Sequence, residues 1–198
     1  MIALIDYGVG NLGSVLNAFK YLGYEAIVTS SKEEILNADK VVLPGVGAFN
    51  DAMDAFKKRG FVEVINEVFK KGTPILGICV GMQMLFEKSY EYGVHDGLGF
   101  LKGNIIKFDN LTYKVPQIGW NQINVIKDNP LLKGLDKKYV YFVHSYHLDF
   151  SEYAIANTNY ANCIYPSAIN YKNIYATQFH PDKSGEVGLQ ILKNFGEL

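Results

Sequence analysis

The first half of the chain alternates short apolar runs with amphipathic segments, and this alternation constrains the fold more than any other feature. The apolar runs cover residues 2–5, 26–28, 40–43 and 74–78. Helix-like segments lie between and after them, at 15–22, 51–71 (with a break near Gly60) and 82–86, and Ser31 with Glu34 three residues later forms a capping box for a further short helix. Strands joined by helices through short turns form βαβ units, so the pattern predicts a parallel sheet covered on both faces.

From about residue 100 the pattern changes to successive strand-like runs. These are 104–108, 121–126, 139–144, 153–157, 167–171 and 174–179, with Lys172-Asn173 as a tight hairpin turn. A final helix is expected to begin near Ser184 and to bury Val187, Ile191, Leu192 and Phe195. The sequence therefore predicts a single α/β domain over residues 1–198. Its core is a flavodoxin-like, mostly parallel central sheet flanked by helices, with an antiparallel extension in the second half.

Composition excludes several classes of protein. Of the 198 residues, 48% are hydrophobic, which is ample material for a core and argues against disorder. With 19 basic and 20 acidic residues, the net charge of −1 gives no basic footprint for nucleic acid or an anionic membrane. No apolar stretch approaches membrane-spanning length, and the run at 1–5 is too short for a secretory leader. Two cysteines cannot build a disulfide framework, so a cytoplasmic, reducing compartment is expected.

Cys79 is the leading candidate for a nucleophile. It lies in Gly77-Ile78-Cys79-Val80-Gly81, directly after a predicted strand and before a predicted helix, which is the G-x-nucleophile-x-G elbow. Small neighbours permit the tight turn, and a helix N-terminus favours the thiolate. The amide that follows the nucleophile, on Val80, can point at a developing oxyanion. The alternative is a small buried thiol that serves only packing.

A thiol nucleophile needs a base, and His180 has the best setting among the four histidines. It ends an apolar strand and is followed by Pro181-Asp182, so a carboxylate can orient the ring and favour its protonated form. The alternative is a surface histidine at a turn. His144 lies at another possible strand end, whereas His95 and His147 resemble loop or strand-face residues. Cys163 has no comparable setting and is expected to pack.

Four segments make the sequence recognisable. They are Pro-Gly-Val-Gly-Ala-Phe at 44–49, Gly-Ile-Cys-Val-Gly-Met-Gln at 77–83, Tyr-Phe-Val-His-Ser-Tyr at 141–146 and Gln-Phe-His-Pro-Asp-Lys-Ser at 178–184. Together they closely resemble the triad (class I) glutamine amidotransferases. Asp-Tyr-Gly-Val-Gly-Asn-Leu at 6–12 and Val-Pro-Gln-Ile-Gly-Trp-Asn at 115–121 narrow the resemblance to the glutaminase subunits of imidazole glycerol phosphate synthases, which act in histidine biosynthesis.

The resemblance implies a role for each matching position. Cys79 would attack the side-chain amide of glutamine to give a thioester and ammonia, His180 would move the proton and Asp182 would orient it. The oxyanion amides would come from Val46 and Val80, and Gly47, Gln83, Ser145 and Tyr146 would hold the substrate. The ammonia would pass to a (β/α)₈ synthase subunit, the heterodimer partner that makes imidazole glycerol phosphate and AICAR. The positions facing that partner would be Asn11, Trp120, Tyr141 and Lys183. The half-reaction implies no metal and no organic cofactor.

Two positions depart from the family pattern. Asp182 stands where the family usually has glutamate, so its carboxylate is one methylene shorter and must approach the histidine differently or through water. Gln117 stands where the family usually has histidine, in a segment near the partner face. That second change bears on which synthase the chain serves, and a paralogous subunit could supply ammonia to another one, such as one that amidinates surface sugars.

Two other readings compete with the amidotransferase interpretation. Gly8-Val9-Gly10-Asn11-Leu12-Gly13 matches the G-x-G-x-x-G of a nucleotide-binding Rossmann module. However, the expected acidic residue is missing from the end of the second predicted strand, which finishes in Thr29-Ser30-Ser31. A cysteine hydrolase acting on γ-glutamyl compounds would share the nucleophile and the histidine, but it would not need Gln83 or the Gly-Trp-Asn segment.

Overall fold

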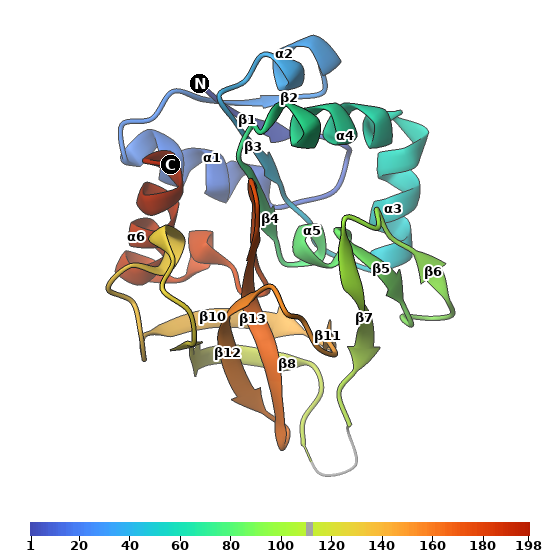
Figure 1. Ribbon diagram of the computed structural model, residues 1–198, viewed down its shortest axis with the longest axis vertical. Helices are drawn as coiled ribbons and strands as arrows, with labels where there is room; N and C mark the ends of the chain where they lie inside the picture. Colours follow the sequence, from blue (N-terminus) through green and yellow to red (C-terminus); the bar gives the residue numbers. More distant parts are fainter. Residues whose placement is uncertain (110–112) are drawn as a thin grey trace.

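An eight-stranded sheet runs through the computed structural model, which describes residues 1–109 and 113–198 (Figure 1). The strand order is β2-β1-β3-β4-β14-β13-β12-β9, and the strands from β2 to β14 pair in parallel. The predicted mostly parallel sheet is therefore confirmed. The parallel strands are β2 (Ala26–Thr29), β1 (Ile2–Ile5), β3 (Lys40–Leu43), β4 (Ile75–Ile78) and β14 (Ile174–Thr177).

Helices cover both faces of this parallel part. Figure 1 shows α1 and α6 on one side of the sheet and α3 and α4 on the other. Gly60, with a φ of 66°, separates α3 from α4, which confirms the predicted break. The short helix α2 begins after Ser31, whose hydroxyl accepts the Glu34 amide at 3.3 Å. The bounds are Leu12–Tyr21 (α1), Lys32–Leu36 (α2), Phe49–Lys58 (α3), Phe61–Lys71 (α4) and Gly185–Gly196 (α6).

The second half of the chain forms the predicted antiparallel extension. Strands β13, β12 and β9 continue the main sheet, and the turn at Lys172-Asn173 joins β13 to β14 as predicted. Two smaller sheets stand beside it, one pairing β10 with β8 and one in the order β11-β7-β5-β6. The predicted strand at 121–126 is instead divided between the end of β8 and the short β9. The bounds are β5 (Phe86–Ser89), β6 (His95–Asp96), β7 (Leu101–Lys107), β8 (Gln117–Gln122), β9 (Asn124–Val125), β10 (Tyr139–His144), β11 (Tyr146–Leu148), β12 (Ala154–Tyr160) and β13 (Cys163–Tyr171).

The helix that follows Cys79 is shorter than its sequence predicts. We expected it to carry residues 82–86, but α5 covers only Val80–Gln83, and Phe86 begins β5. The carbonyl groups of Met84 and Leu85 accept hydrogen bonds from Leu98 (2.8 Å) and Leu101 (3.1 Å). These contacts with a distant segment replace the next helical turn, so tertiary pairing overrides the local helical periodicity.

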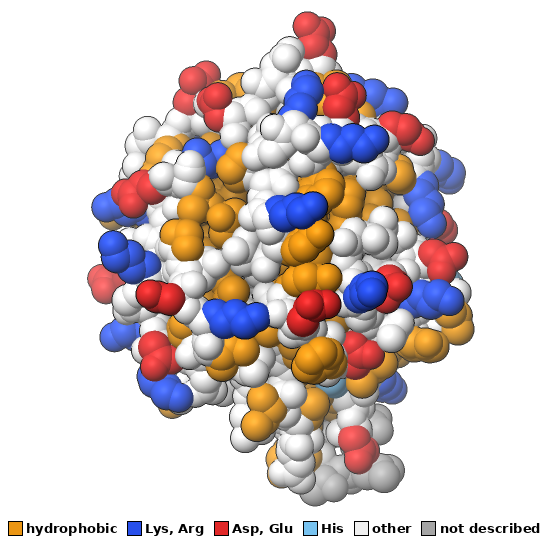
Figure 2. Space-filling model, in the orientation of Figure 1, with side chains coloured by type: hydrophobic (Ala, Val, Ile, Leu, Met, Phe, Trp, Pro, Cys, Tyr) orange, Lys and Arg blue, Asp and Glu red, His pale blue; other side chains and the backbone are white. Residues whose placement is uncertain are grey.

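The surface shown in Figure 2 carries charged side chains of both signs, scattered among apolar and polar areas rather than gathered in one patch. This agrees with the near-zero net charge of the sequence. Within residues 1–109 and 113–198, no helix has the length and apolar character that crossing a membrane requires.

Candidate active site

Cys79 occupies a strained turn between β4 and α5. Its φ of 55° and ψ of −111° are unusual for a residue with a side chain, and its amide donates to the Thr177 carbonyl at 2.8 Å. A Cβ on Gly81 would lie 2.0 Å from the Leu43 carbonyl oxygen, and one on Gly77 would lie 3.0 Å from the Gly81 oxygen. The glycines are required because backbone packs directly against backbone here. The turn therefore has the geometry of a nucleophile elbow.

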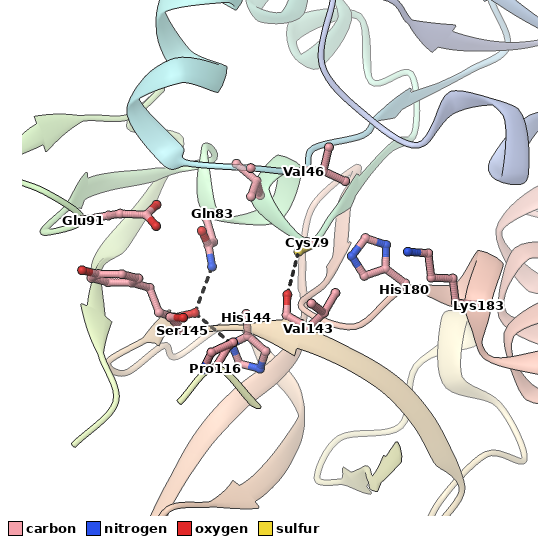
Figure 3. A pocket seen from close by; sticks show the side chains of 13 residues that line it. Val46, Cys79, Gln83, Glu91, Pro116, Val143, His144, Ser145, His180 and Lys183 are labelled. Atoms are coloured by element: carbon pink, nitrogen blue, oxygen red, sulfur yellow. Dashed lines mark hydrogen bonds between the residues drawn. The ribbon is translucent and has the colours of Figure 1, made fainter. Parts of the chain in front are cut away.

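His180 follows β14, the strand next to β4 in the sheet. Thr177 of β14 pairs in parallel with Ile78 of β4, so His180 and Cys79 leave the sheet at the same edge. The imidazole and the thiol lie beside the same cavity in Figure 3. The amide of His180 donates to the Tyr141 carbonyl at 3.0 Å, and its carbonyl accepts the Ser184 hydroxyl at 2.6 Å. These bonds fix the turn that carries the histidine.

Asp182 stands behind the imidazole, on the short 3-10 helix η2 (Pro181–Lys183). Its side chain has no exposed area, and that of His180 is 3% exposed. The two approach to 3.5 Å between Asp182 Oδ1 and His180 Nδ1, which is an ion-pair distance but longer than a normal N–H···O hydrogen bond. Asp182 has one methylene less than the glutamate usual in the family, and its carboxylate does not come within normal hydrogen-bond distance of the imidazole.

The charge state of His180 follows from its neighbours. Burial alone would lower the pKa of the ring, because the cation loses its water. Contacts with the Asp182 carboxylate and with ionised Cys79 outweigh burial and raise the pKa from 6.5 to about 9. The ring is therefore protonated at neutral pH when the sulfur is ionised. A thiolate beside an imidazolium is the arrangement that makes a cysteine nucleophilic.

Gln178 is a buried neighbour of the thiol that the sequence analysis did not single out. Its Nε2 lies 3.8 Å from Cys79 Sγ, and its Oε1 accepts a hydrogen bond from Gln83 Nε2 at 3.0 Å. The same Gln83 nitrogen donates to the Tyr146 carbonyl at 3.0 Å. Gln83 thus connects Gln178, the neighbour of the thiol, with Tyr146 in the segment after β10. The only signal in the sequence was the position of Gln178 two residues before His180.

A cavity of about 410 Å³ opens in front of Cys79. Its lining includes nine residues to which the sequence analysis gave a role: Val46, Gly47, Cys79, Val80, Gln83, Ser145, Tyr146, His180 and Lys183. The chain brings these nine together from four segments, after β3, after β4, at the junction of β10 and β11 and after β14, as Figure 3 shows in part. The other four lining residues had been given no role in the site, namely Glu91, Pro116, Val143 and His144, although His144 had been noted at a possible strand end.

Glu91 gives the cavity a carboxylate opposite the thiol end (Figure 3). One of its oxygens accepts the amide of Phe49, at the first turn of α3, at 2.7 Å. Burial raises the pKa of this carboxyl, and the hydrogen bond from Phe49 partly offsets that rise. A half-buried carboxylate facing a cavity suits a cationic group on a ligand. No local pattern marks Glu91, because it lies in a turn between β5 and β6.

The departure at Gln117 turns out to lie in a buried network. Gln117 is 2% exposed, and its Oε1 lies 2.9 Å from the Tyr165 hydroxyl. That hydroxyl is also 3.2 Å from His144 Nε2, while His144 Nδ1 faces the Tyr146 carbonyl at 2.9 Å. Burial lowers the pKa of His144 to about 3, so the ring is neutral and Nδ1 carries its proton. The Gln117 side chain therefore points inward, toward Tyr165 and His144, and His144 contacts the Tyr146 carbonyl.

The positions expected to face a partner divide into two groups. Trp120 is 57% exposed and packs edge-on against Tyr141, its cross-strand neighbour on β10, with ring centroids 6.2 Å apart. Lys183 is exposed at the rim of the cavity. Asn11, by contrast, turns its side chain inward and donates from Nδ2 to Asp182 Oδ2 at 2.9 Å. Their contacts with a partner subunit stay predictions.

The remaining candidates lie outside the residues that line the cavity. Cys163 is half-buried on β13, with its sulfur 3.9 Å from His147 Nε2, and burial raises the pKa of this thiol. At the glycine-rich turn of the Rossmann alternative, the exposed Arg59 guanidinium lies against Gly8 and donates to the Asp6 carbonyl at 3.2 Å. The described part of the chain holds no group of three or more His, Cys, Asp or Glu side chains placed to bind a metal.

Comparison with protein families identifies relatives over nearly the whole chain. Residues 3–197 match the profile of the family described as Glutamine amidotransferase class-I. A protein of Caldanaerobacter subterraneus subsp. tengcongensis named "Imidazole glycerol phosphate synthase subunit HisH" is 50% identical over 201 aligned positions, covering 100% of this chain and 98% of that protein. A protein of the same name from Chlorobaculum tepidum is 48% identical and is covered, like this chain, to 100%.

Solved structures support the same architecture. The structure of PurLQS from Thermotoga maritima aligns with a TM-score of 0.75 at 17% identity, over 99% of this chain and 97% of that one. A structure described as a glutamine amidotransferase aligns with a TM-score of 0.76 at 18% identity, over 98% of both chains. At this level of identity the likeness concerns the fold alone.

Proposed function

The chain belongs to the class-I glutamine amidotransferase family, and from this premise we propose that it is the glutaminase subunit of an imidazole glycerol phosphate synthase. It hydrolyses glutamine to glutamate and ammonia, and it serves histidine biosynthesis. The single observation that carries the activity is the convergence of the strained Cys79 thiol and the buried His180–Asp182 pair on one cavity. The relatives named HisH carry the assignment to this synthase.

The reaction begins with attack by the Cys79 thiolate on the side-chain amide carbon of glutamine. The new C–S bond pushes the carbonyl electrons onto oxygen, where the amides of Val46 and Val80 stabilise the charge. Val80 is the first residue of α5, and the first amides of a helix lack acceptors within it. His180 then gives its proton to the amide nitrogen. The C–N bond breaks, ammonia leaves and a glutamyl thioester remains.

Water completes the cycle. His180 takes a proton from a water molecule, whose oxygen attacks the thioester carbon. Collapse of that intermediate breaks the C–S bond, releasing glutamate and restoring the thiolate beside the imidazolium. Asp182 stabilises the cationic ring across their buried separation of 3.5 Å. The chemistry needs a free thiol, which suits a reducing, cytoplasmic compartment.

Substrate recognition is assigned to the side of the cavity away from the sulfur. Glu91 pairs with the α-ammonium group of glutamine, because it is the carboxylate that the cavity presents there. Gly47, Ser145 and Tyr146 contact the backbone end of the substrate. Gln83 supports Tyr146 through its hydrogen bond to that carbonyl, so it acts on the substrate site by holding its wall.

The ammonia passes to a (β/α)₈ synthase subunit, which docks on the face that carries Trp120, Tyr141 and Lys183. This face holds large exposed apolar groups next to the cavity, including Ile118 and Trp120, both 57% exposed. Their exposure supports a protein partner, since monomeric proteins rarely expose large apolar side chains next to one another. A paralogue that feeds a different synthase would have the same glutaminase site and would differ in the partner it accepts.

Intact-protein mass after exposure to a diazoketone analogue of glutamine tests the site. We expect one adduct on the wild-type chain in the presence of the (β/α)₈ subunit, and none on Cys79→Ala. The matched control is Cys163→Ala, which removes the other cysteine and should label normally. An adduct that survives in Cys79→Ala, or the absence of any adduct with the partner present, would refute the proposal. Ammonia release from glutamine, measured with and without the same subunit, then identifies the partner.

A further inference from the structure

Asn11 occupies the N-cap position of α1 but does not cap the helix. An asparagine there usually accepts a hydrogen bond from an amide of the first turn, and this side chain makes no such bond. Its Oδ1 instead accepts the Ser14 hydroxyl at 3.2 Å, and its Nδ2 donates to Asp182 Oδ2 at 2.9 Å. The amide is thus held by one neighbour and directed at the carboxylate behind His180.

The Asp182 carboxylate depends on this contact. Its side chain is fully buried, and among the described residues it accepts a hydrogen bond from Asn11. Oδ1 has no hydrogen-bond partner within the described part of the chain, because His180 Nδ1 stands 3.5 Å away. Burying a charge with so few hydrogen-bond donors costs free energy, so loss of the Asn11 donor would raise that cost further.

The orientation of the carboxylate is otherwise weakly determined. Rotation about the Cβ–Cγ bond of an aspartate is broad and roughly two-fold, so packing alone does not fix which way the oxygens point. A contact of 3.5 Å is too long to align the group by hydrogen bonding. Asn11 fixes Oδ2, and the second oxygen is then directed at the imidazole.

We propose that Asn11 is a positioning residue for the Cys79–His180 pair: its amide fixes the plane of the short Asp182 carboxylate and so orients and charges His180. This inference rests on the proposed glutaminase function for its catalytic consequence. It adds a fourth member to the site, from the first β–α turn of the chain. It also gives Asn11 a role within this chain, apart from any contact with a partner subunit.

A double-mutant cycle tests the role. Asn11→Ala removes the donor, and Asp182→Glu lengthens the carboxylate so that it reaches His180 without help. With Asp182 present, we expect Asn11→Ala to lower kcat about tenfold with little change in KM, a partial loss compared with removing an acid–base group. In the Asp182→Glu background the same change should cost less than about twofold. Asn17→Ala is the matched control, since Asn17 is an exposed asparagine on the same helix.

The isolated full-length chain gives a second readout that needs neither glutamine nor a partner. NMR titration of the imidazoles should place His180 near 9 in the wild type and lower by roughly half a unit or more in Asn11→Ala. Asp182→Glu and the double variant should titrate together. An unchanged His180 pKa in Asn11→Ala, or equal losses in both backgrounds, overturns the inference. Wild-type chain without glutaminase activity overturns the proposed function instead, and the titration still decides the role of Asn11.

Discussion

Replacing Gly81 with alanine tests whether the turn at Cys79 depends on direct contact with the end of β3. The added Cβ would lie 2.0 Å from the Leu43 carbonyl oxygen, 2.9 Å from the Leu43 carbonyl carbon and 3.1 Å from that of Pro44. The obstacle is backbone, so no side chain can rotate away. A Cβ on Gly45 would meet the Gly81 amide at 2.3 Å, which shows that the two segments touch from both sides.

The size of the effect follows from these distances. Carbon and carbonyl oxygen normally stay at least about 3.3 Å apart, so the turn and the strand end must separate by roughly 1.3 Å. Overpacking of this kind costs about 3 kcal/mol, at the upper end of the usual range, because two rigid backbones must part. A displacement of about 1 Å at a nucleophile lowers turnover about 100-fold.

Urea unfolding and glutaminase kinetics measure the two consequences. With a denaturant dependence of about 2 to 3 kcal/mol per molar, the unfolding midpoint should fall by roughly 1 M. The control is Gly13→Ala, in the first turn of α1, where a Cβ meets no described atom within 4 Å. It should keep full activity and gain up to about 1 kcal/mol of stability. If Gly81→Ala keeps the wild-type midpoint and turnover, the close-packing argument for the elbow is wrong.

Three further predictions address charge, substrate and partner. The folded pKa of His180, about 9, lies above its ordinary 6.5, so its stabilising contribution is complete below pH 6.5 and is lost as the pH rises through 9. The difference in unfolding free energy between wild type and His180→Gln should therefore shrink by about 3 kcal/mol over that interval; a pH-independent difference would contradict the assigned charge state. Glu91→Gln should raise KM for glutamine by about tenfold and leave kcat nearly unchanged, because the interaction with the α-ammonium group is present in both ground and transition states. Trp120→Ala should weaken binding of the synthase subunit by about tenfold or more in a titration calorimetry experiment, while labelling of Cys79 by the glutamine analogue in the partner-saturated complex stays normal.

Much of the fold could be predicted from local pattern. Four continuous apolar runs and the helical segments between them predicted a parallel sheet, and β1, β2, β3 and β4 form it. A helix does follow Cys79 as predicted, but its predicted extent through residues 84–86 was wrong, because the carbonyls of Met84 and Leu85 pair with a segment that comes later in the chain. Periodicity cannot distinguish a buried helix from a buried strand when every residue is covered, as Met82, Met84, Leu85 and Phe86 are.

In the candidate site, too, local pattern predicted some residues and not others. Cys79 could be recognised because an elbow needs glycines at fixed spacing, and the contacts of Gly77 and Gly81 give that spacing its physical reason. His180 was a candidate from its strand end, but its pairing with Cys79 came from family resemblance. Glu91 carried no local signal, and the only signal for Gln178 was its position two residues before His180. Their roles arise only where separate loops meet around one cavity.

The sequence by itself determined the local geometry: the strand–helix alternation, the glycine-flanked turn and the placement of the candidate nucleophile, Cys79, in that turn. These depend on residues a few positions apart, whose spacing fixes which faces are buried and which turns are possible. Only the tertiary structure placed β14 beside β4, brought His180 to the edge where Cys79 stands, and joined Asn11 to Asp182. Those contacts link residues distant in sequence, so they are decided by how the sheet closes and how its layers pack rather than by any local pattern.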